Sequence, residues 1–351
     1  LDPEAWIEQT LAELAAMDNV TLRDRCMGAG VYDHGYATGY ERLSDHNPGQ
    51  GGPRHRLWRI RAKQIVTATG AIERPLSFAG NDVPGVMLAG AMRDYVVNWG
   101  VTPGQRVVVV TNNDDAYRTA ITLHKAGVEV VRILDARSTG GGALTEQARQ
   151  LGIRVEPGRA IAKITGGKRV TKVAICAQDG EGGAQEEIAA DAVAMSGGWS
   201  PVVHLWSHCG GKLIWDDAQA HFRPDASRPP LGDDGSDFVI AAGSANGAMN
   251  LGGVLADASA AGSAAAKAAG FAAKSAAALD VSDSEETPMQ PIWLMPAKAD
   301  IKLRMKTWLD YQNDVKVSDV QLAAREGYES VEHTKRYTTL GMATDQGKLS
   351  N

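Results

Sequence analysis

The sequence predicts an α/β fold in which one dinucleotide-binding domain is interrupted by a second, with a small, mainly helical domain after them. Two apolar strands that end in glycine turns lie far apart, at residues 65–70 and 238–243. Between them, the β-branched run at residues 106–110 leads into a helical pattern and another strand, which is a βαβ unit. The 39 glycines and the many alanines favour close packing of helices on a sheet.

Length and composition exclude several classes of protein. A chain of 351 residues can form two or three domains, each with its own core. The net charge of -6 argues against binding to nucleic acid, and no apolar run approaches the roughly 20 residues that a membrane helix needs. The three cysteines, Cys26, Cys176 and Cys209, are far apart, which suits the cytoplasm and excludes a flavin disulfide reductase. Because the chain opens on Leu1 rather than on methionine, we expect it to be a fragment of a longer protein.

The outer domain is expected to begin at residues 1–104, with its first strand and glycine turn missing, and to return at residues 201–274. Its first part is predicted to contain, in order, a helix at 4–17, a strand at 20–25 that leads to the glycine-broken Gly28-Ala29-Gly30-Val31, strands at 58–60 and 64–70, and a helix at 89–99 capped by Gly100. The returning part consists of the strand at 238–243 and an alanine-rich helix that ends near residue 269.

Residues 105–200 are expected to form the inserted, Rossmann-like domain. Its predicted helices lie at 116–126 and 143–151, and its strands at 106–110, 128–134, 160–164, 172–177 and 191–195. An acidic, proline-containing linker at 275–291 leads to the small helical domain at 292–351. The predicted class is the two-dinucleotide-binding-domain fold of glutathione-reductase-like flavoproteins, with an inserted Rossmann unit and a small C-terminal domain.

The turn at Gly243 is the strongest candidate for a binding site. A strand that ends in glycine and leads into a helix N-terminus presents backbone N–H groups to a phosphate. Flavin-type two-domain folds commonly carry an acid at this turn, whereas Ser244 stands here, so the electrostatics have changed. The alternative is that Gly243 and Gly247 only allow close packing of a helix on a strand.

The inserted unit has the opposite character at its first turn, residues 111–116. A functional Rossmann turn needs glycines so that the backbone can approach the pyrophosphate, and this turn has none. Asp114 and Asp115 stand at the N-terminal end of the helix, where they would repel a pyrophosphate. We therefore expect a Rossmann shape without its own cofactor. Asp135 has the position of a ribose ligand, but the favoured interpretation is a surface carboxylate.

Two further patterns are weaker. The backbone of Gly28-Ala29-Gly30 can lie along an adenine ring or form a plain β-bulge, and both interpretations stay open. His204 and His208 have helical spacing and are followed by Cys209, as in some metal sites. No further ligand completes the pattern, so a packed or solvated pair is favoured and no metal site is predicted.

A basic cluster follows on the last predicted helix, formed by His333, Lys335 and Arg336. These side chains can contact an anionic flavin phosphate at a subunit interface. A solvated helix face is the favoured alternative, and the sequence does not decide the role of the cluster.

Several strings resemble the alpha subunit of heterotetrameric sarcosine oxidase. The first two run from Ile65 through Gly70 to Pro75, and then from Pro84 to Met87. Others are Thr111-Asn112-Asn113-Asp114 with Ala116-Tyr117-Arg118-Thr119-Ala120, Gln312-Asn313-Asp314-Val315, Ala324-Arg325-Glu326-Gly327-Tyr328, Ser330-Val331-Glu332-His333, Lys335-Arg336-Tyr337-Thr338 and the stretch Gly341–Lys348. The likeness covers nearly the whole chain and is most specific in its last part.

The resemblance implies an oxidoreductase subunit that carries no catalytic residue of its own. Members of the family oxidise sarcosine to glycine, with formaldehyde or a methylene-folate, and hydrogen peroxide. The FMN and FAD of the complex are held mainly by the beta subunit, and gamma and delta subunits complete the heterotetramer. The alpha subunit binds NAD non-catalytically, and the local motifs carry its contacts to Gly28, Ser244, Met249 and Leu251, beside the turn at Gly243.

The resemblance also implies two parts beyond this sequence: a first glycine-rich turn before Leu1, and a domain that binds tetrahydrofolate after Asn351. Residues 310–348 resemble small domains that hold a two-iron two-sulfur cluster in related dehydrogenase subunits. Such a cluster needs four thiolates, and this stretch has none, with Asp345 at an expected cysteine position. That pattern favours an oxygen-using oxidase. The alternatives are a component of an opine, octopine or proline-type dehydrogenase and a non-catalytic scaffold subunit.

Overall fold

The chain divides into two compact units. The computed structural model describes residues 2–47, 49, 51–273, 279, 281–282 and 286–348. Unit 1 consists of Leu1–Ala71, Pro201–Asp216 and His221–Asp283, and unit 2 of Ile72–Ser200, Asp217–Ala220 and Ser284–Asn351. Of the predicted linker at 275–291, residues 275–278, 280 and 283–285 lie outside the described residues.

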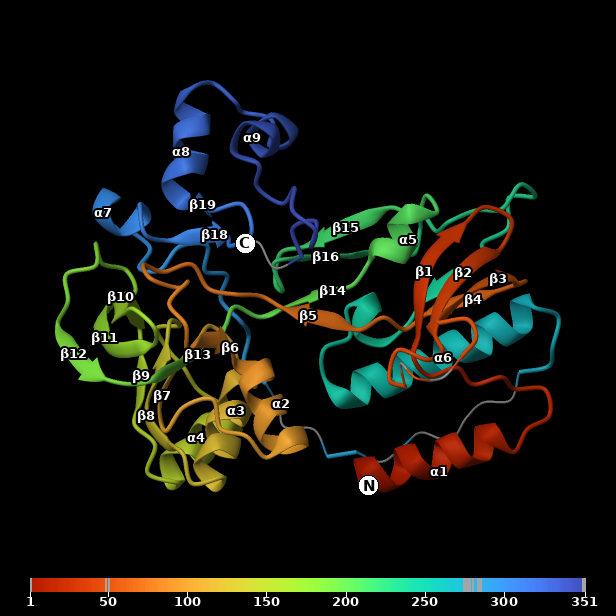
Figure 1. Cartoon of the computed structure of the whole chain (residues 1–351), viewed down its shortest axis with the longest axis horizontal. Coiled ribbons are helices and arrows are strands. Elements are labelled where there is room, and N and C mark those ends of the chain that lie inside the picture. The colour runs from red at the N-terminus through yellow and green to blue at the C-terminus, as the bar shows by residue number, and fades with distance from the viewer. Residues whose placement is uncertain are drawn as a thin grey trace. The chain divides into compact units, whose positions relative to one another are not determined.

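Unit 1 combines an antiparallel sheet, a parallel strand pair and a long helix (Figure 1). Strands β1, β2 and β3 form the antiparallel sheet, and β4 pairs in parallel with β17. The elements are α1 (Pro3–Ala15), β1 (Cys26–Tyr32), β2 (Tyr36–Arg42), β3 (His55–Arg61), β4 (Ile65–Thr67), α5 (His204–His208), β15 (Leu213–Asp216), β16 (His221–Pro224), β17 (Val239–Ala241), the 3-10 helix η1 (Gly243–Asn246) and α6 (Leu251–Ala268).

Part of the prediction for unit 1 is wrong. Residues 20–25 are not a strand; the strand begins at Cys26, and the three residues Gly28-Ala29-Gly30 lie within it. The register of β1 against β2 shifts between Gly28 and Gly30, which is a β-bulge. Strand β2 has no counterpart in the prediction, because its glycine and charged residues obscure the alternation that marks a half-buried strand.

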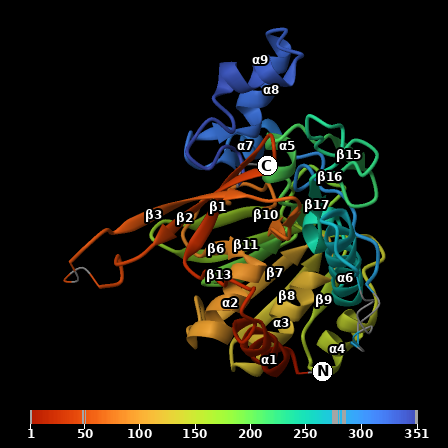
Figure 2. The ribbon, with the colours of Figure 1, turned by 90° about the vertical axis from the view of Figure 1, so that its right-hand side faces the viewer.

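Unit 2 is built around a five-stranded parallel sheet with the order β6-β13-β7-β8-β9, and Figure 2 shows β7, β8 and β9 side by side. A three-stranded antiparallel sheet, β10-β11-β12, accompanies it. The elements are β6 (Val86–Leu88), α2 (Ala89–Trp99), β7 (Arg106–Thr111), α3 (Asp115–Lys125), β8 (Glu129–Asp135), α4 (Ala143–Gln150), β9 (Val155–Pro157), β10 (Arg159–Gly166), β11 (Val170–Ala177), β12 (Glu186–Ala189), β13 (Ala192–Ser196), α7 (Ile301–Arg304), β18 (Trp308–Asp310), β19 (Val315–Lys316), α8 (Val317–Arg325) and α9 (Val331–Thr338).

The β-branched run of β7 places this sheet between two apolar layers. Val107 and Val109 belong to a core shared with α2, α3 and α4, whereas Val108 and Val110 belong to a core shared with β10 and β11. Successive side chains of a strand point to opposite faces, so a strand covered on both faces must be apolar throughout. The predicted helices and strands of the inserted unit are confirmed to within two residues.

The compact units divide at another place than the expected domain boundary at residue 104, since unit 2, which contains the inserted unit, begins at Ile72. Strand β6 pairs in parallel with β13 at the edge of the five-stranded sheet, and α2 contacts both strands. A three-residue strand carries too little periodicity to reveal its sheet from sequence. Two connecting strands, β5 (Ala71–Glu73) and β14 (Trp199–Pro201), contain two of the points where the chain passes from one unit to the other.

The segment from residue 292 onward is mainly helical, as predicted, but belongs to unit 2 rather than standing alone. The side-chain amide of Asn81 makes two bonds to one residue of this segment: Asn81 Nδ2 donates to the carbonyl of Trp308 at 2.8 Å, and Asn81 Oδ1 accepts from the N–H of Trp308 at 2.9 Å. Among the described residues, we find no helix whose length and apolar character would let it cross a membrane.

Candidate functional site

The turn between β17 and α6 in unit 1 is closed by a carboxylate from α6. Gly243 has a φ of 67°, which favours glycine. Its N–H donates to Asp257 Oδ2 at 2.7 Å, and Asn246 Nδ2 donates to Asp257 Oδ1 at 3.1 Å. The N–H of Gly243 therefore already has a partner, and the binding capacity of this turn depends on the residues that follow it.

The start of α6 carries no negative charge. Its first turn contains no acid, and the cap residue Asn250 accepts from the N–H of Gly253 at 2.7 Å. The positive end of an 18-residue helix dipole is thus presented with small and apolar side chains, Leu251, Gly252 and Gly253. This arrangement suits an anionic group such as a diphosphate.

Four of the five predicted contact residues lie in one continuous stretch. Gly243 is buried, Ser244 and Met249 are half-buried, and Leu251 is 49% exposed at the first position of α6. Gly28 lies apart from them in sequence, exposed on β1, where an added Cβ would meet only Leu205 at 3.8 Å. The bulge at Gly28 does not prevent a contact with an adenine ring. Such a contact remains a prediction.

We expect Asp257→Asn to loosen this turn. The variant keeps one acceptor but loses the charge that strengthens the bond from Gly243, at a cost of about 1–2 kcal/mol. Amide hydrogen exchange of Gly243 should accelerate, and Asn246→Ala, which removes only one of the two bonds, should have a smaller effect. Unchanged exchange at Gly243 in Asp257→Asn would show that the carboxylate does not hold the turn.

The corresponding edge of unit 2 is occupied by a buried ionic cluster. Arg137 donates to Asp114 at 2.6 Å and to Asp135 at 2.7 Å, with side-chain exposures of 5%, 1% and 0% for the three residues. Tyr117 donates its hydroxyl to Asp135 at 2.8 Å. The prediction that Asp135 is a surface carboxylate is therefore wrong. Burial lowers the pKa of Arg137, but the bonds and charges of Asp135 and Asp114 outweigh it and raise that pKa overall.

Glu73 is a buried carboxyl group in the same unit. It is 5% exposed, its Oε2 accepts from the N–H of Gly90 at 2.8 Å, and its Oε1 has no hydrogen-bond partner. Burial raises its pKa to about 7, against the lowering effects of the nearby Ser196 hydroxyl, the Gly90 N–H and the charge of Arg93, and the charge of Asp115 adds a smaller rise. Glu73 is therefore the carboxyl group here whose protonation changes near neutral pH.

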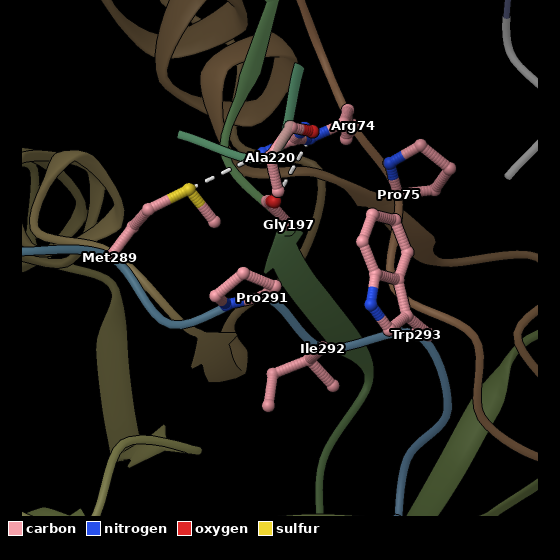
Figure 3. A pocket seen from close by; sticks show the side chains of 8 residues that line it. All are labelled: Arg74, Pro75, Gly197, Ala220, Met289, Pro291, Ile292 and Trp293. Atoms are coloured by element: carbon pink, nitrogen blue, oxygen red, sulfur yellow. Dashed lines mark hydrogen bonds between the residues drawn. The ribbon is translucent and has the colours of Figure 1, made fainter. Parts of the chain in front are cut away.

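Arg74 is a cation with neutral partners. Its guanidinium donates to the carbonyls of Gly197 at 3.2 Å and Gln219 at 3.0 Å and to the carbonyl of Ala220, and its Nη2 lies 3.4 Å from the sulfur of Met289 (Figure 3). Within the described part of the chain, Arg74 makes no ion pair. Burial lowers its pKa to about 10, which leaves it charged at neutral pH.

The weaker candidates are structural. The ring of His208 packs edge-on against Tyr32 with centroids 4.8 Å apart, and the thiol of Cys209 donates to the carbonyl of Leu205 at 3.1 Å. Burial raises the pKa of that thiol. In the described ranges, no group of three or more His, Cys, Asp or Glu side chains could hold a metal ion.

The basic cluster lies on α9, a helix none of whose residues is buried. His333 and Arg336 are exposed and Lys335 is half-buried. Its role as a phosphate contact or a solvated face remains a prediction.

Comparison with known proteins identifies the family. The family described as the sarcosine oxidase A3 domain matches residues 304–351. The alpha subunit of the sarcosine oxidase of Rhizobium meliloti (strain 1021) is 40% identical over 99% of this chain, and that of Corynebacterium sp. (strain P-1) is 41% identical over 99%. The chain is a homologue of the sarcosine oxidase alpha subunits. It spans about a third of the length of these relatives, 33% and 36% respectively.

Other comparisons agree with this placement. An opine oxidase subunit of Agrobacterium tumefaciens (strain Ach5) is 28% identical over 64% of the chain and 47% of that relative. An L-proline dehydrogenase from P. horikoshii superimposes with a TM-score of 0.70 at 20% identity, covering 99% of this chain and 60% of that one. A thioredoxin reductase from T. acidophilum superimposes with a TM-score of 0.52 at 18% identity, covering 76% and 79%. The fold is thus the two-dinucleotide-binding-domain fold predicted from the sequence.

Sequence reasoning missed Asp257 and Arg137, and only the first had a clear signal. Asp257 and Lys267 are the two charged residues of the alanine-rich helix α6, and a lone acid on an apolar helix indicates an inward partner. Arg137 follows a strand end, where a charged residue is ordinary. Its burial depends on residues brought together from distant parts of the chain.

Proposed function

We propose that the chain is the NAD-binding part of an alpha subunit in an oxidase that demethylates sarcosine to glycine with formation of hydrogen peroxide. The dinucleotide lies in unit 1, at the stretch that contains Gly243, Ser244, Met249 and Leu251, with Gly28 as its remaining contact. It is bound without taking part in the reaction. The beta, gamma and delta subunits are the partners; FMN and FAD reside mainly on the beta subunit, and tetrahydrofolate binds to another domain.

A difference between the N-terminal ends of two helices supports this location of the site. α6 begins with Leu251-Gly252-Gly253 and has no acid in its first turn, whereas α3 begins with Asp115 after Asp114. A diphosphate is stabilised by the first and repelled by the second. Ser244, at the turn where flavoproteins carry an acid, offers a neutral hydroxyl, which accords with a ligand other than FAD.

The 40% identity to sarcosine oxidase alpha subunits, against 28% to an opine oxidase subunit, favours sarcosine oxidation over the alternative amine substrates. The residues of this chain bind and position; they supply no acid, base or nucleophile to the oxidation. A cytoplasmic location is part of the same proposal, because unpaired cysteines are typical of a reducing compartment.

Leu251→Glu tests the site with little risk to folding. A carboxylate at the first position of a helix favours the helix dipole, so the stability of α6 should be kept or improved. The same charge beside a diphosphate should repel it and reduce the NAD retained after purification by about tenfold or more. The matched control, Leu251→Gln, has the same shape without the charge and should retain NAD. Equal NAD content in the two variants would show that the diphosphate does not bind at the start of α6.

A further inference from the structure

The five residues from Glu286 to Gln290, here called the strap, are each bound by the inserted unit. The N–H of Thr287 donates to Asp114 at 2.7 Å, and its hydroxyl donates to the same carboxylate at 2.9 Å. The strap lies within the stretch that the sequence predicts as a linker, and its residues are held by several bonds.

The other strap residues have partners on both sides of Thr287. Glu286 pairs with Arg118 at 2.6 Å, and the carbonyl of Pro288 accepts from Arg137 at 3.3 Å. The sulfur of Met289 lies 3.4 Å from Nη2 of Arg74. Figure 3 draws this contact as a dashed line. Gln290 makes a reciprocal pair with Asn112: its N–H donates to the Asn112 carbonyl at 3.1 Å, and its carbonyl accepts from Asn112 Nδ2 at 2.8 Å.

Several of these partners lie at the carboxyl ends of the parallel strands, which is the edge where a Rossmann unit binds its dinucleotide. Thr111 ends β7 and Asp135 ends β8, and in doubly wound folds a dinucleotide lies across the carboxyl ends of these two strands. Asp114, at the start of α3, stands where the pyrophosphate would lie, and Asp135 stands where the ribose would bind. Here Arg137 joins the two carboxylates, and the hydroxyl of Thr287 accepts from Arg137 at 2.9 Å while it donates to Asp114.

We propose that the strap is an internal ligand of the inserted unit, held by the Asp114–Arg137–Asp135 cluster in the place of a dinucleotide. The cluster does two things at once. Its one guanidinium pairs with two carboxylates, so the cluster keeps a net negative charge that repels a diphosphate. It also presents the ordered acceptors and donors that fix the strap. This inference is independent of NAD binding in unit 1, because none of the strap contacts involves a residue of that unit.

Amide hydrogen exchange in the natural protein tests the first half of the proposal. Thr287→Val removes the hydroxyl from a nearly equal volume, and Asp114→Asn removes the charge while Asp135 still pairs with Arg137. Each should accelerate exchange of the peptide 286–291 about tenfold or more, since bonds to charged groups are lost. Glu286→Gln, the matched control at the half-exposed rim, should change it by less than about threefold.

The amide of Trp308 serves as an internal reference, because Asn81 binds it independently of the strap. Its exchange should stay unchanged in all three variants. Unchanged exchange of the strap in Thr287→Val and Asp114→Asn would overturn the proposal. Loosening of Trp308 together with the strap would also overturn it, because the cluster would then support the whole unit rather than the strap.

Photolabelling with 8-azido-NAD tests the second half of the proposal, which is that the strap occupies the place of a dinucleotide in the inserted unit. In the natural protein, peptides that contain residues 111–118 and 135–141 should stay unlabelled. Labelling of these peptides would mean that the edge accepts a dinucleotide, and the strap would not be its ligand. Labelling at residues 243–253 would instead report on the proposed NAD site in unit 1. The two proposals would therefore be contradicted by different results.

Discussion

Glu73→Gln is expected to raise the free energy of unfolding at pH 8 relative to the natural protein by about 3 kcal/mol. The pKa of Glu73 is raised from 4.5 to about 7 in the folded chain, and each unit of difference corresponds to about 1.4 kcal/mol. Because the folded pKa lies above the unfolded one, the stabilising contribution is complete below pH 4.5 and is lost as the pH rises through 7. Glutamine stays neutral and can still accept from the N–H of Gly90.

Urea unfolding of both proteins at intervals from pH 4.5 to pH 8 measures this effect. The difference between the two curves should grow through that interval and level off above pH 7. Glu129→Gln is the control, since Glu129 is a surface carboxylate, 52% exposed in its ion pair with Arg106. Parallel pH profiles for Glu73→Gln and the natural protein would contradict the assignment of a buried, protonated carboxyl.

Arg137→Met is expected to destabilise the chain by about 3–5 kcal/mol. The variant leaves Asp114 and Asp135 buried without their cation, and an uncompensated buried charge is far more costly than a lost surface pair. Arg106→Met, which breaks the exposed pair with Glu129, should cost less than about 1 kcal/mol.

A triple variant separates charge from packing. Adding Asp114→Asn and Asp135→Asn to Arg137→Met removes the unpaired charges and should recover much of the loss in the urea midpoint. A cost for Arg137→Met as small as that for Arg106→Met would show that the cluster does not hold the edge of the sheet.

The elements of the inserted unit could be predicted because their signals are local. The run Val107–Val110 is apolar on both faces, and the helix α3 follows it directly. Strand β6 and the boundary at Ile72 could not be predicted in this way, because three residues show no period and their sheet partner, β13, lies about a hundred residues later. Long-range pairing decides such an element.

The candidate sites show the same difference between local signals and long-range contacts. The sequence predicts that Asp114 and Asp115 repel a diphosphate, because it shows both their charge and their position at the start of a helix. The bonds from Arg137 and Thr287 to Asp114 could not be predicted from the sequence, since Thr287 lies 173 positions away from Asp114. Gly243 was recognised as a turn, yet the carboxylate that closes it comes from Asp257, two turns into the following helix.

The most direct test of the proposed NAD binding in unit 1 is to isolate the natural protein with the partner subunits proposed above and denature it. The released nucleotide is then identified and counted by mass spectrometry. We expect NAD at close to one per chain, with FMN and FAD in proportion to the beta subunit. FAD bound to this chain, or a chain without any nucleotide, would contradict the placement of NAD in unit 1.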